Sequence, residues 1–157
     1  MALEVLCSSY ELEESGDVVA VGDYISRHVS RWNTVYYGTE LDHIEWSFDS
    51  EAEADGSTAT TISGDCTVIS AIFVRLTHVP GKGWTPVTGS AHVERIESTA
   101  DTRQIKPAID WGPVSTPDAH GHAYSAGYPR MEEGDEHHSG WLITLEPFRI
   151  DAPRDGA

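Results

Sequence analysis

Basic residues are scarce in this chain. Its 157 residues include 10 Lys and Arg against 26 Asp and Glu, which gives a formal net charge of −16 at pH 7. Residues 1–65 hold 14 of the acids and only Arg27 and Arg31 as bases. A protein that binds nucleic acid needs a basic surface to displace the counterions of the phosphates. The composition therefore argues against direct binding to a nucleic acid.

Cysteines and long apolar runs are scarce as well. Cys7 and Cys66 are too few for a disulfide framework, so reduced thiols in a cytoplasm are the simpler interpretation. No run approaches the ~18 apolar residues that a membrane span needs. Residues 1–7 contain no basic segment followed by an apolar one, so we expect no secretory signal. These features predict a cytoplasmic protein that does not bind membranes.

Helical periodicity is also missing. No segment repeats apolar residues at helical spacing, with caps, over three turns. Several short stretches have the alternation or the β-branched and aromatic content of strands instead. They are residues 3–7, 18–21, 24–29, 44–48, 58–62, 91–96 and 141–145. We therefore predict an all-β fold, a small barrel or sandwich of about 6–9 mostly antiparallel strands.

Residues 66–78 form the longest stretch that can bury both faces of a strand. One face would hold Cys66, Val68, Ile72, Val74 and Leu76, and the other Ile69, Ala71 and Phe73. Residues 64–65 mark its expected start, and the Gly- and Pro-containing residues 80–83 its end. A strand that is apolar on both faces belongs in the middle of a sheet. We expect the other strands to pair with it or to close around it.

The length predicts a single domain over residues 1–150. Residues 110–140 are rich in Gly, Pro and His and poor in aliphatic side chains, so we expect one long loop there. Residues 151–157 are expected to form a flexible C-terminal tail. Residues 105–109 contain Pro107 and would be an edge strand or no strand.

Three segments, taken in order, resemble a family of small, uncharacterised actinobacterial proteins. They are residues 10–16 with 19–23, residues 64–72, and residues 139–145, and residues 86–91 and 97–101 fit the later portion. Members of that family often have a cysteine near the first glycine, where this chain has Ser15 before Gly16. The resemblance implies a compact β fold and transfers no activity.

Histidines in the long loop are the candidate metal ligands. His120 and His122 are spaced two residues apart, and His137 and His138 follow fifteen residues later. Neutral imidazoles with nearby carboxylates can bind Zn²⁺ or another divalent metal. The spacing matches no established metal motif, so solvated loop histidines are the alternative. A metal-dependent enzyme would need His120, His122 and one of the later pair to converge.

Catalytic motifs are missing from the sequence. His92-Val93-Glu94 has the His-x-Glu of zinc deaminases, but no cysteine follows Cys66 to complete that site. There is no Gly-x-Ser-x-Gly nucleophile elbow, and residues 81–83 lack the frame of a phosphate-binding loop. We therefore predict no catalytic residue, and no cofactor apart from the metal just considered.

Trp32, Tyr36 and Tyr37 are the candidate binding residues, because aromatic side chains near an acidic surface can anchor a ligand or a partner peptide. The alternative is that they close one end of the core. We favour a non-enzymatic acidic β module that binds a protein partner or associates with itself. A second hypothesis is an acidic decoy that imitates a nucleic acid and inhibits a nucleic-acid-binding protein. The third is the metal-dependent enzyme.

Overall fold

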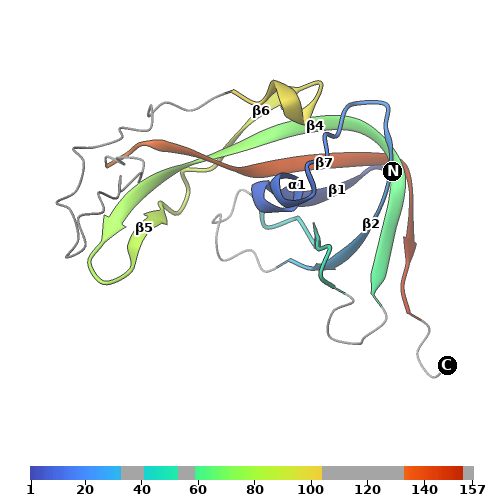
Figure 1. The fold of residues 1–157 in the computed structure, drawn as a ribbon, viewed down its shortest axis with the longest axis horizontal. Helices are drawn as coiled ribbons and strands as arrows, with labels where there is room; N and C mark the ends of the chain where they lie inside the picture. The colour runs from blue at the N-terminus through green and yellow to red at the C-terminus, as the bar shows by residue number, and fades with distance from the viewer. Residues whose placement is uncertain (33–40, 53–58, 104–132, 154–157) are drawn as a thin grey trace, which may run out of the picture.

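The computed structural model describes residues 1–32, 41–52, 59–103 and 133–153. Within these residues it confirms the all-β prediction, since seven strands belong to one mixed sheet (Figure 1). The strands are β1 (Leu3–Ser8), β2 (Tyr24–Arg31), β3 (Trp46–Phe48), β4 (Thr60–Val79), β5 (Gly83–Pro86), β6 (His92–Ile96) and β7 (Glu136–Asp151). Helix α1 (Ser9–Ser15) and the 3-10 helix η3 (Thr99–Asp101) complete the described elements.

The sheet closes into a ring. Its strand order runs β2-β3-β1-β7-β4, and the first part of β4 pairs back onto β2, from Thr60 opposite Val29 to Asp65 opposite Tyr24. β1 and β3 are parallel, and the other pairs of the ring are antiparallel. Beyond β2, the same edge of β4 pairs with β6 and then with β5, while β7 follows its other edge.

β4 is the central strand that the sequence predicts, but it begins at Thr60 rather than near Gly64. The stretch expected as a separate strand, residues 58–62, contributes Thr60–Ile62 as the first residues of β4. Irregularities in pairing with β7 between Gly64 and Cys66, and between Cys66 and Val68, accompany a sharp bend (Figure 1). These shifts also correct the predicted faces, because Cys66 packs in the same cluster as Ile69 rather than with Ile72.

Two hydrophobic clusters cover the two faces of the central strands. The first lies inside the ring and includes Val5, Cys7, Leu12, Ile25, Val29, Phe48, Ile62, Cys66, Ile69, Phe73, Trp141, Ile143 and Leu145. The second lies on the outer face and includes Leu6, Leu41, Ile44, Ile72, Val74, Leu76 and Leu142. Both cysteines are buried free thiols. The prediction that β4 buries apolar residues on both faces is therefore confirmed.

Helix α1 is an element that the sequence pattern missed. It spans seven residues, too few to show helical periodicity over three turns. Its ends are nevertheless well defined, since the Ser8 side chain accepts a hydrogen bond from Glu11 N and Gly16 ends the helix at φ 71°. Leu12 is its buried residue, and it fixes the helix on the inner core.

Other local predictions also change. Residues 18–21 form no regular strand but make one isolated bridge, from Ala20 to Ser98, before a turn at residues 21–22. Ala20 N donates to Asp23 Oδ2 across that turn. β7 begins at Glu136 and so takes the end of the predicted loop into the sheet. Residues 83–86, which begin at the predicted end of the central strand, form β5. No helix in the described part of the chain is long and apolar enough to cross a membrane.

Candidate binding groove

One strand edge of the ring has no described partner strand over half its length. β2 pairs with β4 from Tyr24 to Val29, but on its other edge it pairs with β3 only from Val29 to Arg31. His28 O accepts a hydrogen bond from Asp49 N at 2.9 Å, which shows that His28 directs its backbone groups to the β3 side. Alternate residues of a strand direct their N–H and C=O to the same edge. Ser26 therefore directs its backbone donor and acceptor to this edge, where no described strand pairs with it.

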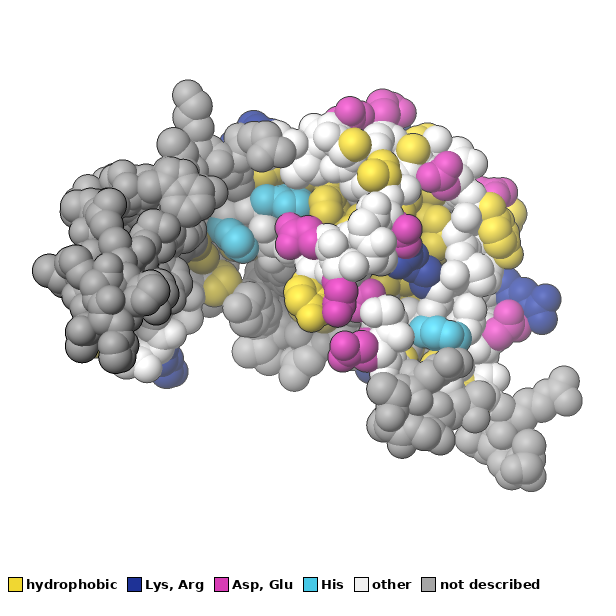
Figure 2. All heavy atoms as spheres, in the orientation of Figure 1, with side chains coloured by type: hydrophobic (Ala, Val, Ile, Leu, Met, Phe, Trp, Pro, Cys, Tyr) yellow, Lys and Arg dark blue, Asp and Glu magenta, His cyan; other side chains and the backbone are white. Residues whose placement is uncertain are grey.

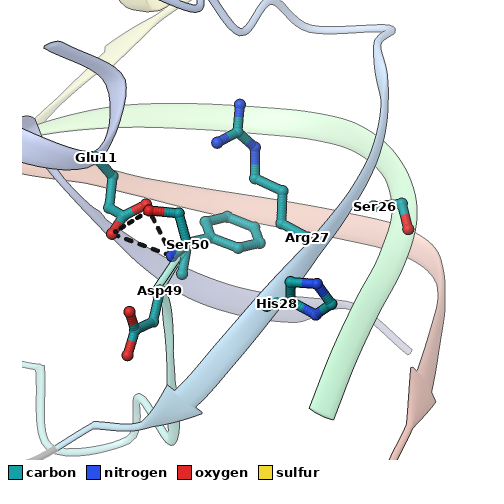
Figure 3. A pocket seen from close by; sticks show the side chains of 7 residues that line it. Glu11, Ser26, Arg27, His28, Asp49 and Ser50 are labelled. Carbon is teal, nitrogen blue, oxygen red and sulfur yellow. Dashed lines mark hydrogen bonds between the residues drawn. The ribbon is translucent and has the colours of Figure 1, made fainter. Parts of the chain in front are cut away.

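Two adjoining hollows follow this edge. The first, of about 180 Å³, is lined by Glu11, Ser26, Arg27, His28, Phe48, Asp49 and Ser50 (Figure 3). The second, of about 320 Å³, is lined by residues 17–19 and 23–27. The two hollows share Ser26 and Arg27 as lining residues, and together they are named here the β2 groove. In Figure 2 acidic side chains border the hollowed part of this face, and a basic side chain is visible within it.

Glu11 and Ser50 form the wall opposite β2. The Glu11 carboxylate accepts hydrogen bonds from Ser50 N at 3.2 Å and from Ser50 Oγ at 3.4 Å (Figure 3). These bonds connect α1 to the residues that follow β3. Phe48, at 3% exposure, gives the first hollow an apolar floor that belongs to the inner core. The wall is therefore held by the cap of α1 and by core packing together.

Arg27 lies between the two hollows. Its Nη2 donates to Asp17 Oδ2 at 2.7 Å, and its side chain is 25% exposed. It also lies near the buried Cys7: burial raises the pKa of that thiol to about 12, and the positive charge of Arg27 opposes the rise. The pair with Asp17 gives Arg27 a counterion within the groove.

The charges around the groove are mostly negative. Four carboxylates lie along it, those of Glu11, Asp17, Asp23 and Asp49, against the single guanidinium of Arg27. Asp49 Oδ1 accepts from Glu51 N at 3.0 Å, a bond to a neutral donor. His28 Nδ1 lies 3.1 Å from Thr61 Oγ1, so its ring is held toward β4. A cationic ligand is therefore better matched to this groove than an anionic one.

Exposed apolar side chains lie at the outer end of the groove. Tyr24 is 70% exposed and Val18 60% exposed, and both line the second hollow. Large exposed apolar side chains beside a polar depression are common at protein interaction sites. They add contact area for a partner at that end.

Of the aromatic residues predicted to bind a partner, Trp32 is half-buried against the second core cluster. That position suits a core residue as well as a binding residue. Tyr36 and Tyr37 lie outside the described residues.

His137 and His138 of the predicted metal set lie in β7, whereas His120 and His122 lie outside the described residues. Adjacent residues of a strand point to opposite faces, so the two imidazoles of β7 diverge. His138 packs edge-on against Trp141, with ring centroids 4.7 Å apart. Among the residues that the structure describes, no group of three or more His, Cys, Asp or Glu side chains could hold a metal ion.

The His-x-Glu segment considered in the sequence belongs to an ion-pair cluster. Arg103 makes two hydrogen bonds to Glu94, at 3.0 and 3.2 Å, and one to Glu136 at 2.8 Å. His92 Nε2 lies 3.3 Å from Glu136 Oε1, and the His92 ring stacks on Phe73. The bonds to Arg103 lower the pKa of the Glu94 carboxyl. Since its charges are mutually paired, this cluster connects β6 to β7 and is a structural clamp.

Sequence reasoning missed the β2 groove entirely. The local signals of one wall are present, since Ser8 and Glu11 have the spacing of a helix cap. The unpaired edge depends on strand order, which has no local signal. No protein-family model, curated protein or solved structure matches this chain. The geometry of the groove is therefore the basis for assigning a function.

Proposed function

We propose that this protein is a non-enzymatic module that binds an extended segment of another protein along the β2 groove. The observation that carries the proposal is the edge of β2 at Tyr24 and Ser26, which has no described partner strand and lines two hollows. An incoming strand would pair with the N–H and C=O of Ser26. Strand addition of this kind supplies affinity through the main chain and specificity through pockets for alternate side chains.

The surroundings of the edge favour a specific partner over general aggregation. Natural sheets protect open edges with charged residues and with covering loops or helices. Here Arg27 and Asp17 place an ion pair across the groove, and α1 stands on its far side. A segment can enter only if it fits between β2 and this wall. The acidic rim further restricts the partner to one whose charge is complementary.

The test is selection of binding peptides from a phage library of random twelve-residue segments, followed by binding measurements on two variants of Ser26. Ser26→Pro removes the backbone donor that faces the groove, whereas Ser26→Ala keeps it and removes only the hydroxyl. We expect the selected peptides to bind the parent and Ser26→Ala alike and to lose at least tenfold in affinity for Ser26→Pro. Thermal melts of both variants establish that they are folded.

Hydrogen exchange gives a readout that does not depend on any variant. The Ser26 amide should exchange quickly in the free protein and slowly with peptide bound, while the Arg27 amide, which is directed toward β4, should be protected in both states. Unchanged exchange at Ser26, equal binding to Ser26→Pro, or a library that yields no binder would refute the proposal. A concentration-dependent dimer that Ser26→Pro dissociates would place a second copy of this chain in the groove instead.

A further inference from the structure

We infer that the hollow beside Phe48 receives a Lys or Arg side chain of the bound segment. This inference rests on the proposed function and names the chemistry of the partner. A strand added to β2 directs alternate side chains to each face of the sheet, and the first hollow is lined by Phe48 of the inner core. Its floor is apolar and its border carries carboxylates, which matches a side chain with an apolar stem and a cationic head.

The charges around the first hollow determine that the bound head group is positive. Arg27 already has Asp17 as a counterion at 2.7 Å. Glu11 and Asp49, in contrast, accept hydrogen bonds from the neutral groups of Ser50 and Glu51 and form no ion pair within the described residues. A carboxylate bonded only to neutral donors gains more from a new cation than a carboxylate that already has one. Glu11 and Asp49 both line the first hollow, so the charge of its border favours an incoming ammonium or guanidinium.

The size and floor of the hollow suit the stem of such a side chain. A dry cavity of about 150 Å³ holds a benzene molecule, and this hollow measures about 180 Å³. The methylene groups of Lys and Arg can lie on apolar surface while the charged head stays with polar groups. Phe48 lines the hollow and supplies an apolar contact at its floor. An acidic side chain would meet Glu11 and Asp49 with the same charge.

The experiment repeats the peptide selection on the parent and on the double variant Glu11→Gln, Asp49→Asn, which keeps the shape of the hollow and removes its charge. The matched control is Glu13→Gln, Glu14→Gln, which changes the net charge equally on the same helix but away from the hollow. We expect parent-selected peptides to share Lys or Arg at one fixed position. Replacing it with norleucine should weaken binding to the parent and to the control about tenfold, and binding to the Glu11, Asp49 variant less than twofold.

The possible failures separate the two proposals. Peptides that need the Ser26 backbone but show no basic position, or an acidic one, would overturn the basic pocket and leave the strand-addition groove standing. An equal loss in both double variants would show a general effect of net charge and would also overturn the pocket. Binding that is indifferent to Ser26→Pro would remove the groove itself, and the pocket with it.

Discussion

At the scale of single residues, Phe73 connects the inner core to the structural clamp formed by His92, Glu94, Arg103 and Glu136. Its side chain is fully buried in β4, and the guanidinium of Arg103 lies 4.3 Å from its ring centroid. The rings of His92 and His138 pack around it at 5.5 and 5.6 Å. Phe73 therefore supports both the inner cluster and the connection between β6 and β7.

Phe73→Ala should lower the free energy of unfolding by about 3–5 kcal/mol, because it removes a buried ring and leaves a cavity. Urea denaturation monitored by circular dichroism measures the change. Val93→Ala is the control on the neighbouring strand: Val93 is 48% exposed, so the effect should be within about 0.5 kcal/mol. Equal urea midpoints for Phe73→Ala and the parent would contradict the central position of this ring.

The residues of the core could be predicted from the sequence, whereas the residues of the groove could not. The alternation of apolar residues at Ile69, Ala71 and Phe73 predicts a buried strand, and all three lie in the inner core. Glu11 and Asp49 look like any solvated acid in sequence. Their role depends on which segments the topology brings beside them, and that information is long-range.

At the scale of elements, β7 approaches β1 so closely that no side chain fits between them at Gly140. A Cβ atom added there would overlap the carbonyl oxygen of Cys7 and lie 3.0 Å from Ser8 Cα. Both neighbours are backbone atoms of β1, which cannot move without disturbing the ladder from Leu3 to Ser8. Glycine at this position is a packing requirement.

Gly140→Ala should therefore destabilise the protein by about 1–3 kcal/mol, the usual range for overpacking. Differential scanning calorimetry gives the shift in melting temperature. Arg149→Ala serves as the control within β7, because its side chain is 78% exposed and its replacement should leave the melting temperature nearly unchanged. If Gly140→Ala melts with the parent, the close contact between β7 and β1 is wrong.

Strand positions could be predicted from the sequence better than strand order. Residues 3–7, 24–29 and 141–145 fall within observed strands, and residues 91–96 overlap β6 from His92 onward, because local patterning marks a strand. The bend near Cys66 could not be anticipated, since the irregular pairing arises from how β7 matches β4. The two-turn helix α1 is too short for a periodic signal, although Ser8 and Gly16 mark its ends.

At the scale of the whole molecule, stability should fall in mild acid. Burial lowers the pKa values of His137 and His138 below the ordinary value of 6.5. Below pH 6.5 the unfolded chain binds more protons at these histidines than the folded chain does. Their contribution to the free energy of unfolding is therefore fully present above pH 6.5 and is lost as pH falls through the folded pKa values. Most carboxylates titrate near pH 4, so their protonation reduces the net charge of −16 only at lower pH.

We expect the melting temperature to decrease steadily from about pH 7.5 to about pH 5.5, the range in which histidines titrate. The double variant His137→Gln, His138→Gln should flatten this dependence, while His78→Gln, at an exposed position of β4, should retain it. Melts in buffers of constant ionic strength give the comparison. A melting temperature that stays level or rises over this range in the parent would contradict the assignment.

The position of β7 also constrains how the chain is made. β7 is inserted between β1 and β4, so both strands have an unfilled edge until the last strand arrives. On the ribosome, the first 135 residues can form hairpins such as β4 with β5, but the ring stays open. Closure must wait until residues 136–151 leave the exit tunnel. Closure of the ring accordingly follows synthesis of β7, and a nascent chain stalled before β7 exposes unpaired strand edges to chaperones and to other nascent chains.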